Sequence, residues 1–265
     1  MRARRTGARY AVGCGPRAAR RTQAMAHSAP SMKRILLKLS GESFCKPGGF
    51  GIEPAELDWI ASEVEEAVAT GAQLAVVVGG GNIIRGAELA AQGHIAQATA
   101  DHMGMLGTVI NGLALKEKLA SMGVDCRVQS AIEIRAVAEP FIRGRALRHL
   151  EKGRVVILAA GTGNPFFTTD TCAALRATEL ECGVLMKATK VDGVYSADPR
   201  KDKDAVRYDE LTFGEALSKR LRVMDMTALA MGSENRIPVI VFDFKQRGNI
   251  ARVARGERIG TLLHS

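Results

Sequence analysis

Short apolar runs in this chain end repeatedly in glycine-bearing turns, and this arrangement leaves few folds open. Residues 35–39 run into Ser40-Gly41, residues 74–78 into Gly79-Gly80-Gly81-Asn82, and residues 155–160 into Gly161-Thr162-Gly163. Each run is short and rich in Val, Ile, Leu or Ala, which is typical of a strand that is buried on both faces. Helical patterns follow these turns, so a largely parallel sheet is expected.

Strand and helix patterns alternate through the rest of the chain. Further strands are expected at residues 126–129, 184–187 and 238–242, and helices at 56–70, 101–119, 171–181, 209–219 and 225–235. Asp101 and Asp225 are placed to cap the helices that follow them. We therefore predict an α/β fold, a three-layer sandwich with a central, mostly parallel sheet and helices on both faces. No internal repeat or linker divides residues 32–265, so one domain is expected there.

The basic character of the chain lies in its first 31 residues. The net charge is +9, but residues 1–31 contain seven arginines and no acidic residue, so the remainder is nearly neutral. This segment is expected to be a disordered extension, or the result of a start site placed too early, with Met32 and Met25 as later starts; its composition also fits a transit peptide. Without a basic stripe in the body, direct nucleic-acid binding is not expected.

Hydropathy and cysteine usage bear on the location of the protein. No apolar stretch approaches the length that spans a bilayer, so a soluble protein is expected. The cysteines are odd in number and lack metal-ligand spacing, which is typical of reduced cytosolic thiols. A cytoplasmic location without membrane contact is the resulting expectation.

The segment from Thr162 to Asp170 has the composition of a phosphate or nucleotide loop. It connects an expected strand to an expected helix, whose first N–H groups favour anions. Thr168 and Thr169 add hydroxyl donors, and Phe166 and Phe167 offer flat faces to a base. The alternative is an ordinary turn in which Thr169 or Asp170 caps the helix. The chain has neither a Walker loop nor the glycine pattern of a dinucleotide-binding fold, nor the motifs of protein kinases.

Basic side chains lie within or just after expected strands. Lys38 and Lys187 each interrupt an apolar run near its end, and Arg85 follows the glycine triplet. These side chains either protect edge strands or point into a crevice at the sheet edge. Together with backbone N–H groups, they suit transfer of a phosphoryl group to an acceptor that is already ionised, which needs no general base.

These segments resemble the bacterial uridylate (UMP) kinases of the amino-acid kinase superfamily. The resemblance extends from about Lys33 to Leu263 and is carried by five motifs: Lys38-Leu39-Ser40-Gly41-Glu42, Gly79-Gly80-Gly81-Asn82 with Arg85, Asp101-His102-Met103-Gly104, residues 162–170, and residues 187–199. It implies an amino-acid kinase-like fold and the reaction ATP + UMP → ADP + UDP with Mg²⁺. The Thr162–Asp170 loop is the part that looks specific to uridylate.

The resemblance also implies roles for residues. Lys38, Asp170 and Lys187 would be catalytic. The ATP-binding residues would be Lys38, Leu39, Ser40, Gly41, Gly81, Arg85, Thr189, Tyr195 and Asp198. The UMP-binding residues would be Gly80, Asp101, Thr162, Gly163, Asn164, Pro165, Phe166, Phe167, Thr168 and Thr169. No metal ligands are assigned, since Mg²⁺ would be held mainly by the ATP phosphates.

The resemblance further implies a homohexamer that is activated by GTP and inhibited by UTP. The positions tied to GTP match Gly48, Gly49, Phe50, Gly51, Arg127 and Arg154. Cys45-Lys46-Pro47 departs from the family pattern beside them, which puts effector binding in doubt. Two alternatives stay open: another kinase of the superfamily, acting on carbamate, glutamate or isopentenyl phosphate, and a module of the same fold that binds nucleotide or a metal oxide without turnover.

Overall fold

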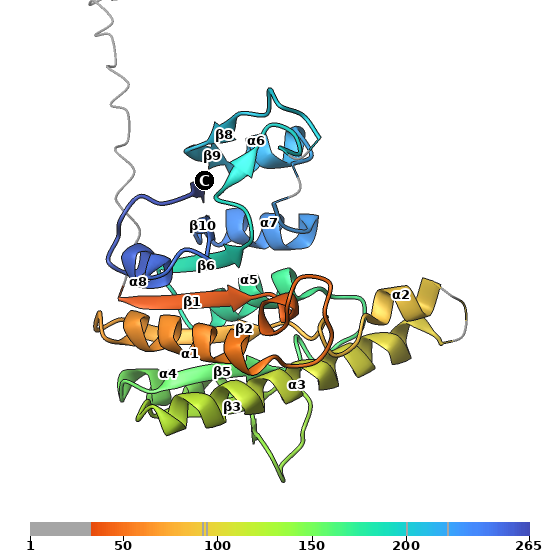
Figure 1. Cartoon of the computed structure of the whole chain (residues 1–265), viewed down its shortest axis with the longest axis vertical. Helices are drawn as coiled ribbons and strands as arrows, with labels where there is room; N and C mark the ends of the chain where they lie inside the picture. Colours follow the sequence, from red (N-terminus) through yellow and green to blue (C-terminus); the bar gives the residue numbers. More distant parts are fainter. Residues whose placement is uncertain (1–32, 92, 94, 200, 222) are drawn as a thin grey trace, which may run out of the picture.

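The computed structural model of the chain describes residues 33–265 apart from residues 92, 94, 200 and 222. A central twisted sheet runs through the molecule, with helices packed against it (Figure 1). Its nine strands follow the order β4-β3-β5-β2-β1-β6-β10-β11-β9. The expected extension at residues 1–31 lies outside the described residues, as does Met32.

All neighbouring strands of this sheet are parallel except β10 and β11, which are antiparallel. The strands are β1 (Arg34–Leu39), β2 (Gln73–Val78), β3 (Cys126–Ser130), β4 (Glu139–Pro140), β5 (Val155–Ala159), β6 (Val184–Thr189), β9 (Glu210–Thr212), β10 (Val239–Asp243) and β11 (Thr261–His264). A small second sheet pairs β7 (Val194–Tyr195) with β8 (Arg207–Tyr208).

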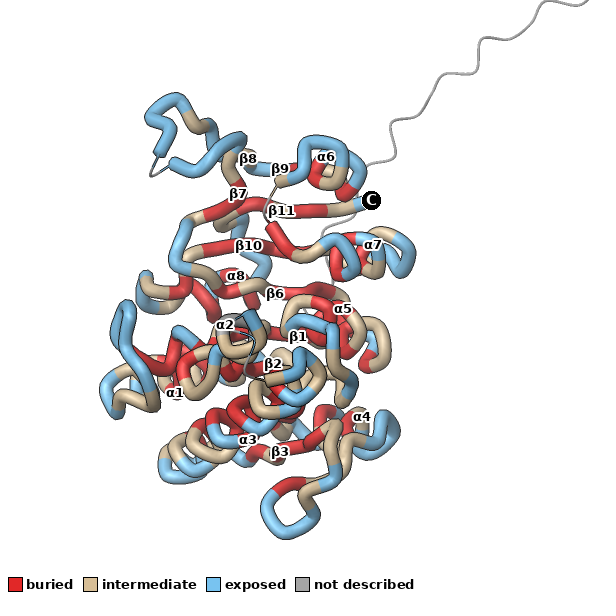
Figure 2. Tube along the Cα trace, turned by 90° about the vertical axis from the view of Figure 1, so that its right-hand side faces the viewer, coloured by how far each residue is buried: buried red, intermediate tan, exposed pale blue. Residues whose placement is uncertain are grey.

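Helices cover both faces of the large sheet, because parallel neighbours must be joined by crossovers. They are α1 (Pro54–Val68), α2 (Gly86–Ala91), α3 (Gln97–Ser121), α4 (Arg143–Glu151), α5 (Thr169–Glu179), α6 (Phe213–Ser218), α7 (Met226–Glu234) and α8 (Asn249–Ala254), with a short 3₁₀ helix η1 (Gly41–Phe44). Figure 2 shows α1, α3 and α8 on one side of the buried strands and α4, α5 and α7 on the other. The predicted three-layer α/β fold is confirmed.

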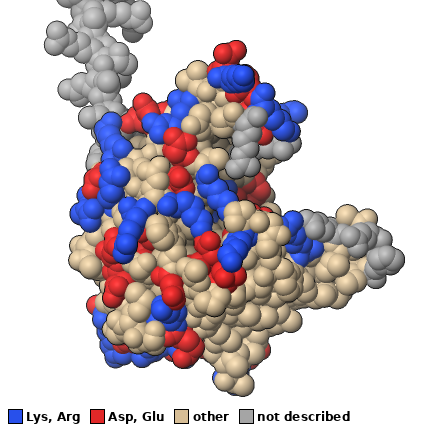
Figure 3. Space-filling view, viewed as in Figure 1, with Lys and Arg blue, Asp and Glu red and all other residues tan. Residues whose placement is uncertain are grey.

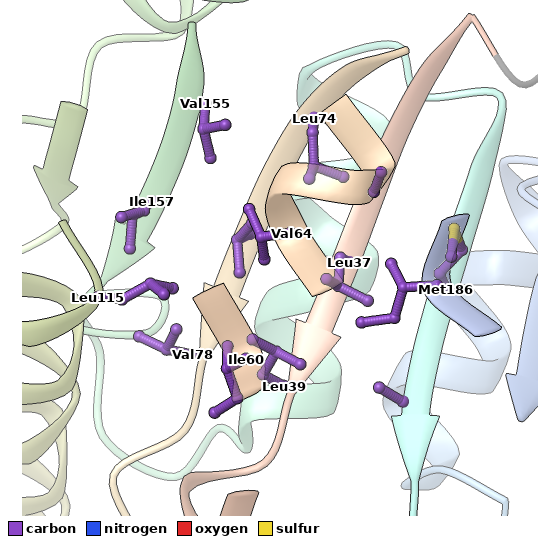
Figure 4. Close-up of a cluster of buried hydrophobic side chains, with 14 of the residues drawn as sticks. Leu37, Leu39, Ile60, Val64, Leu74, Val78, Leu115, Val155, Ile157 and Met186 are labelled. Atoms are coloured by element: carbon purple, nitrogen blue, oxygen red, sulfur yellow. The ribbon is translucent and has the colours of Figure 1, made fainter. Parts of the chain in front are cut away.

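Side chains of the central strands β1, β2, β5, β6 and β10 alternate between two hydrophobic cores. On β1, Leu37 and Leu39 face the core beneath α1, α3 and α8; in Figure 4, Ile60 lies beside Leu39, and Leu115 lies beside Val78 and Ile157 in the same core. Leu36 faces the other core, together with residues of α4, α5, α6 and α7. Since side chains alternate along a strand, Lys38 falls on the α5 side of the sheet.

Several expectations about the elements were wrong. Helix α3 begins at Gln97, with Ala96 as its N-cap, so Asp101 lies inside the helix and does not cap it. The helix expected at 209–219 is strand β9 followed by α6, which starts with a capping box between Thr212 and Glu215. Asp225 does cap α7 as expected, accepting the amide of Ala228.

Of the two alternatives for Lys38 and Lys187, the structure excludes the one that places them on edge strands. Strand β1 lies between β2 and β6, and β6 lies between β1 and β10, so both lysines belong to the middle of the sheet. A charged residue in an interior strand has no edge to protect, and it needs partners for its charge.

Two further expectations can be compared with the residues that the structure describes. Among these residues, no helix is long and apolar enough to cross a membrane. The cysteines at 45, 126, 172 and 182 are free and buried, and burial raises the pKa of Cys172 to about 11 and that of Cys182 to about 12. One domain over residues 32–265 stays a prediction.

Replacing Leu115 tests the core beneath α3. The side chain is fully buried in the cluster that also holds Ile157 and Val128. Leu115→Ala should lower the free energy of unfolding by roughly 2–5 kcal/mol, because it removes apolar contacts and leaves a cavity. Leu106→Ala, on the same helix but 47% exposed, should change it by less than about 0.5 kcal/mol. Urea unfolding measures both, and equal losses would contradict the assignment of the core.

Candidate active site

Two lysines lie side by side in the centre of the sheet. Lys38 of β1 and Lys187 of β6 are direct partners in the parallel register, and both face α5. Between them stands Asp170, in the first turn of α5: Lys38 Nζ is 3.0 Å from its Oδ1, and Lys187 Nζ is 2.6 Å from its Oδ2. The Lys187 ammonium also donates to the carbonyl of Val223. The three side chains are 11–16% exposed, so this cluster is nearly enclosed.

The pKa shifts follow from this arrangement. Burial alone would raise the pKa of Asp170, but the charges of Lys38 and Lys187 and their hydrogen bonds outweigh it, so the pKa is lowered and the group stays a carboxylate. Burial lowers the pKa of Lys187, with Asp170 opposing the effect and Lys38 adding to it. Two lysines and one carboxylate give the cluster a formal excess of one positive charge in a poorly solvated place, which suits an incoming anion.

The start of α5 is fixed by Thr168 and Asp225. Thr168, not Thr169 or Asp170, is the N-cap, and its Oγ1 accepts the amides of Asp170 and Thr171 at 3.1 and 3.2 Å. That hydroxyl donates to Asp225 Oδ2 at 2.5 Å, and Thr171 Oγ1 donates to the same carboxylate. Asp225 thus joins the N-termini of α5 and α7, and holds Asp170 at its place between the lysines.

The glycine turns after β1 and β2 touch through their backbones. A Cβ on Gly41 would come within 2.5 Å of the Gly81 nitrogen, and one on Gly79 within 2.6 Å of the Gly41 nitrogen. Gly80 packs in the same way on α3, where a Cβ would lie 2.4 Å from the Gly104 carbonyl oxygen. Only glycine allows these approaches, so the turns place backbone groups where side chains would otherwise stand.

A buried amide pair holds the glycine triplet. Asn111 of α3 donates to the Gly79 carbonyl at 2.7 Å and to Asn82 Oδ1 at 2.6 Å. Asn82 donates in turn to the Gly51 carbonyl at 2.8 Å, and its own carbonyl accepts the Gly51 amide. Because both asparagines are buried, leaving either unpaired would be costly, and the turn is held in one conformation.

Two adjoining cavities open at this edge of the sheet. The first, of about 310 Å³, is lined by Lys38, Ser40, Gly41, Glu42, Gly79, Gly80, Gly81, Arg85 and Thr169. The second, of about 270 Å³, is lined by Lys38, Ser40, Glu42, Ser43, Lys187, Ala188, Thr189, Lys190 and Phe244. Lys38, Ser40 and Glu42 belong to both, so the cavities meet at the end of β1. On the face seen in Figure 3, basic and acidic side chains are interspersed.

The loop from Thr162 to Phe167 leads to Thr169, which lines the first cavity, but none of the loop's own residues is among those that line either cavity. Phe166 and Phe167 are 74% and 50% exposed, so their rings are accessible; that they stack on a base stays a prediction. Asp101 holds the tip of this loop: its Oδ2 accepts the Phe166 amide at 2.8 Å, and Phe166 has a φ of 70°. Asp101 therefore lies next to the loop with which the sequence grouped it, in contact with its backbone.

Other residues from the sequence analysis are more scattered. Leu39 is fully buried, so its backbone alone can reach a ligand. Thr189 lines the second cavity, whereas the Tyr195 hydroxyl donates to Asp192 at 2.6 Å and the exposed Asp198 lies outside both cavities described above.

The residues assigned to an effector are not brought together within the chain. Gly51 contacts Asn82 at the carboxyl ends of the strands. Arg127 and Arg154 lie at the amino ends of β3 and β5, where both bind Asp125. Hydrogen bonds to Arg154 and Arg127 lower the pKa of that carboxyl despite its slight burial.

Sequence reasoning overlooked Glu42 as a site residue. Its carboxylate lies 3.6 Å from Arg85 Nη2 and 3.3 Å from Lys190 Nζ, and it lines both cavities. Its place directly after Ser40-Gly41 was the available signal. Phe244, just beyond the end of β10, was also missed. Among the described residues, no group of three or more His, Cys, Asp or Glu side chains could hold a metal ion.

Two glycine substitutions test the packing of the turns. Gly41→Ala would force its Cβ into the backbone at Gly81 and should lower the free energy of unfolding by roughly 1–3 kcal/mol. Gly81→Ala is the matched control, because its Cβ meets nothing within 4 Å and its φ is not positive. Thermal unfolding compares the two, and equal stabilities would contradict the close approach.

Comparison with known proteins agrees with this geometry. Residues 33–243 match the amino acid kinase family. A protein of Zymomonas mobilis named uridylate kinase is 53% identical over 237 residues, which cover 89% of this chain and 98% of that protein. The crystal structure of UMP kinase from Bacillus anthracis superposes with a TM-score of 0.85 at 39% identity, covering 88% of this chain and 96% of the other. For UMP kinase from Ureaplasma parvum, the TM-score is 0.83 at 36% identity, with coverage of 88% and 99%. The chain belongs to the amino acid kinase family.

Proposed function

We propose that this chain is a uridylate kinase that transfers the γ-phosphoryl group of ATP to UMP. The observation that carries the proposal is the Lys38–Asp170–Lys187 cluster, which stands where two cavities meet. Its charge excess and the surrounding backbone N–H groups suit two phosphate groups that approach each other. The uridylate choice is supported by the loop from Thr162 to Thr169 and by the names of the relatives.

Phosphoryl transfer to UMP requires the protein mainly to position the two nucleotides and to neutralise their charge. An acceptor phosphate oxygen is already ionised near neutral pH, so no side chain has to remove a proton before attack. Lys38 borders both cavities and can contact donor and acceptor groups, while Lys187 borders the second. Asp170 does not react in this scheme; it orients the two ammonium groups and balances their repulsion.

The first cavity is lined by residues of both assigned sets: Gly80 and Thr169 from the acceptor set, and Ser40, Gly41, Gly81 and Arg85 from the ATP set. We therefore assign to it the acceptor phosphate and the group that passes to it from ATP. The second leads from Lys187 to Thr189, and we assign the remaining phosphates and the adenosine side of ATP to it. In this arrangement, Asp101 and the loop beside it would close over the uridine.

A magnesium ion would arrive with ATP. Asp170 is engaged by two lysines and is not among the residues that line the cavities, whereas the Glu42 carboxylate lines both. This donor set fits an ion that is held mainly by the nucleotide phosphates and neutralises their charge. A homohexamer, activation by GTP, inhibition by UTP and a cytoplasmic location remain predictions carried by the family resemblance.

The choice of acceptor is the direct test of this function. ADP release should be measured with ATP and Mg²⁺ and with UMP, CMP, AMP or glutamate as acceptor. We expect UMP to give the highest kcat/KM. Preference for glutamate or AMP would contradict the proposal and favour another kinase of the superfamily.

Lys38→Met should lower kcat far more than it weakens UMP binding. The cation contacts charge that is redistributed during transfer, so its loss is expected to cost roughly 10²–10³-fold in kcat. Steady-state rates and calorimetric UMP titration separate the two effects. Lys219→Met, which removes a lysine on the Tyr208 ring, is the control and should behave as the parent. A parent-like kcat in the Lys38 variant would refute its role.

Asp170→Asn should change the pH profile as well as the rate. The carboxylate raises the pKa of Lys187 against the effects of burial and of Lys38, so its loss should lower that pKa further. The alkaline limb of kcat should therefore move to lower pH, with a fall of roughly 10²-fold at neutral pH. Asp209→Asn, at an 86% exposed position, should leave the profile unchanged. An unshifted alkaline limb in the Asp170 variant would contradict the coupling.

A further inference from the structure

The turn that leads from β5 into the loop at 162–169 has an uncommon backbone. Ala160 and Gly161, directly after the strand, have φ values of 60° and 57°. A glycine adopts this left-handed conformation freely, but an alanine does so only when its surroundings hold it. Ala160 is fully buried, so its amide must also find a partner inside the protein. The direction of the loop depends on this pair of residues.

Thr108 of α3 supplies that partner. Its buried hydroxyl accepts the Ala160 amide at 2.6 Å and donates to the Met105 carbonyl at 2.7 Å. The same turn of α3 packs on the glycine triplet, since a Cβ on Gly80 would lie 2.9 Å from the Thr108 nitrogen. One residue thus touches both the first cavity's glycine turn and the base of the loop.

Arg176 of α5 holds the next carbonyl. Its guanidinium donates to the Gly161 oxygen at 3.4 Å and binds Glu179 at 2.5 Å. Phe141 lies against it, 3.8 Å from ring centre to guanidinium carbon, and the side chain is only 6% exposed. A charge so deeply buried is retained only with specific partners, and its planar fork cannot be replaced by an ammonium.

We propose that Thr108 and Arg176 are positioning residues that set the affinity for the acceptor nucleotide by fixing the left-handed turn at Ala160–Gly161. The inference rests on the proposed function, because it assigns the 162–169 loop to the acceptor. Neither side chain lines the two cavities, and both act through the backbone of the turn. The adenosine side of ATP is assigned to the second cavity, which neither side chain lines, so donor binding should depend on them much less.

Thr108→Val removes the hydroxyl and keeps the shape of the side chain. The Ala160 amide is then buried without a partner, and KM for UMP should rise about tenfold. KM for ATP should change by less than about twofold, because the donor cavity is untouched. Thr108→Ser keeps the hydroxyl and should behave as the parent. Thr178→Val, which removes a hydroxyl bonded to Ala174 within α5, is the matched control and should also behave as the parent.

Arg176→Lys provides the second, independent variant. It keeps the charge but loses the fork that reaches both Glu179 and Gly161, so KM for UMP should rise about fivefold, with KM for ATP again unchanged. Thermal unfolding confirms that each variant is folded. An equal rise in both KM values, or a rise in Thr108→Ser as large as in Thr108→Val, would overturn the proposal.

Hydrogen exchange separates failure of this inference from failure of the proposed function. The Ala160 amide should exchange slowly in the parent and at least tenfold faster in Thr108→Val, with no substrate present. Should the parent transfer no phosphoryl group to UMP, the proposed function fails, and this arm still decides whether Thr108 holds the turn. An unchanged exchange rate of the Ala160 amide in Thr108→Val would refute the role of Thr108 in holding the turn.

Discussion

A single carboxylate between two lysines is the interaction on which this site depends. Lys38 and Lys187 occupy facing positions on adjacent strands, where two like charges would repel at short range in a poorly solvated interior. Asp170 offsets that repulsion only because α5 begins at this point of the sheet. The charge of the site therefore depends on both the strand register and the residue at which α5 begins. A shift of either strand by one residue would turn a lysine into the opposite core.

Polar groups at a distance from the lysines keep this arrangement in place. Asp225 ties the first turn of α5 to that of α7, and Asn111 with Asn82 fixes the glycine turn on the other side. The asparagine contacts are buried and the contact of Asp225 with the Ala228 amide is partly buried, whereas that with Thr168 is exposed; together they bind backbone as well as side chains. Rigid support of this kind suits chemistry that relies on position and charge rather than on a reactive side chain.

Local sequence patterns predicted much of this structure, and the errors have a common physical origin. Strands β1, β2 and β5 were predicted because their apolar runs lie next to glycine turns in the chain. The partner of Asp101 could not be found in this way, because the Phe166 amide lies 65 residues further along. Thr168 rather than Thr169 caps α5 because its hydroxyl is also bound by Asp225, which only the folded chain brings near. Short helices such as α2 and α8 have too few residues for a clear period.

The sharing of Lys38, Ser40 and Glu42 by both cavities has a consequence for molecules that bind here. A compound that places an anionic group where the two cavities meet would bind Lys38, which borders both nucleotide sites, and would compete with both nucleotides. Its inhibition should then be relieved by raising either nucleotide, unlike that of a compound confined to one cavity. Resistance mutations at Lys38, Ser40 or Glu42 would also be difficult to tolerate, since a change that repels the compound disturbs the groups that hold the natural ligands.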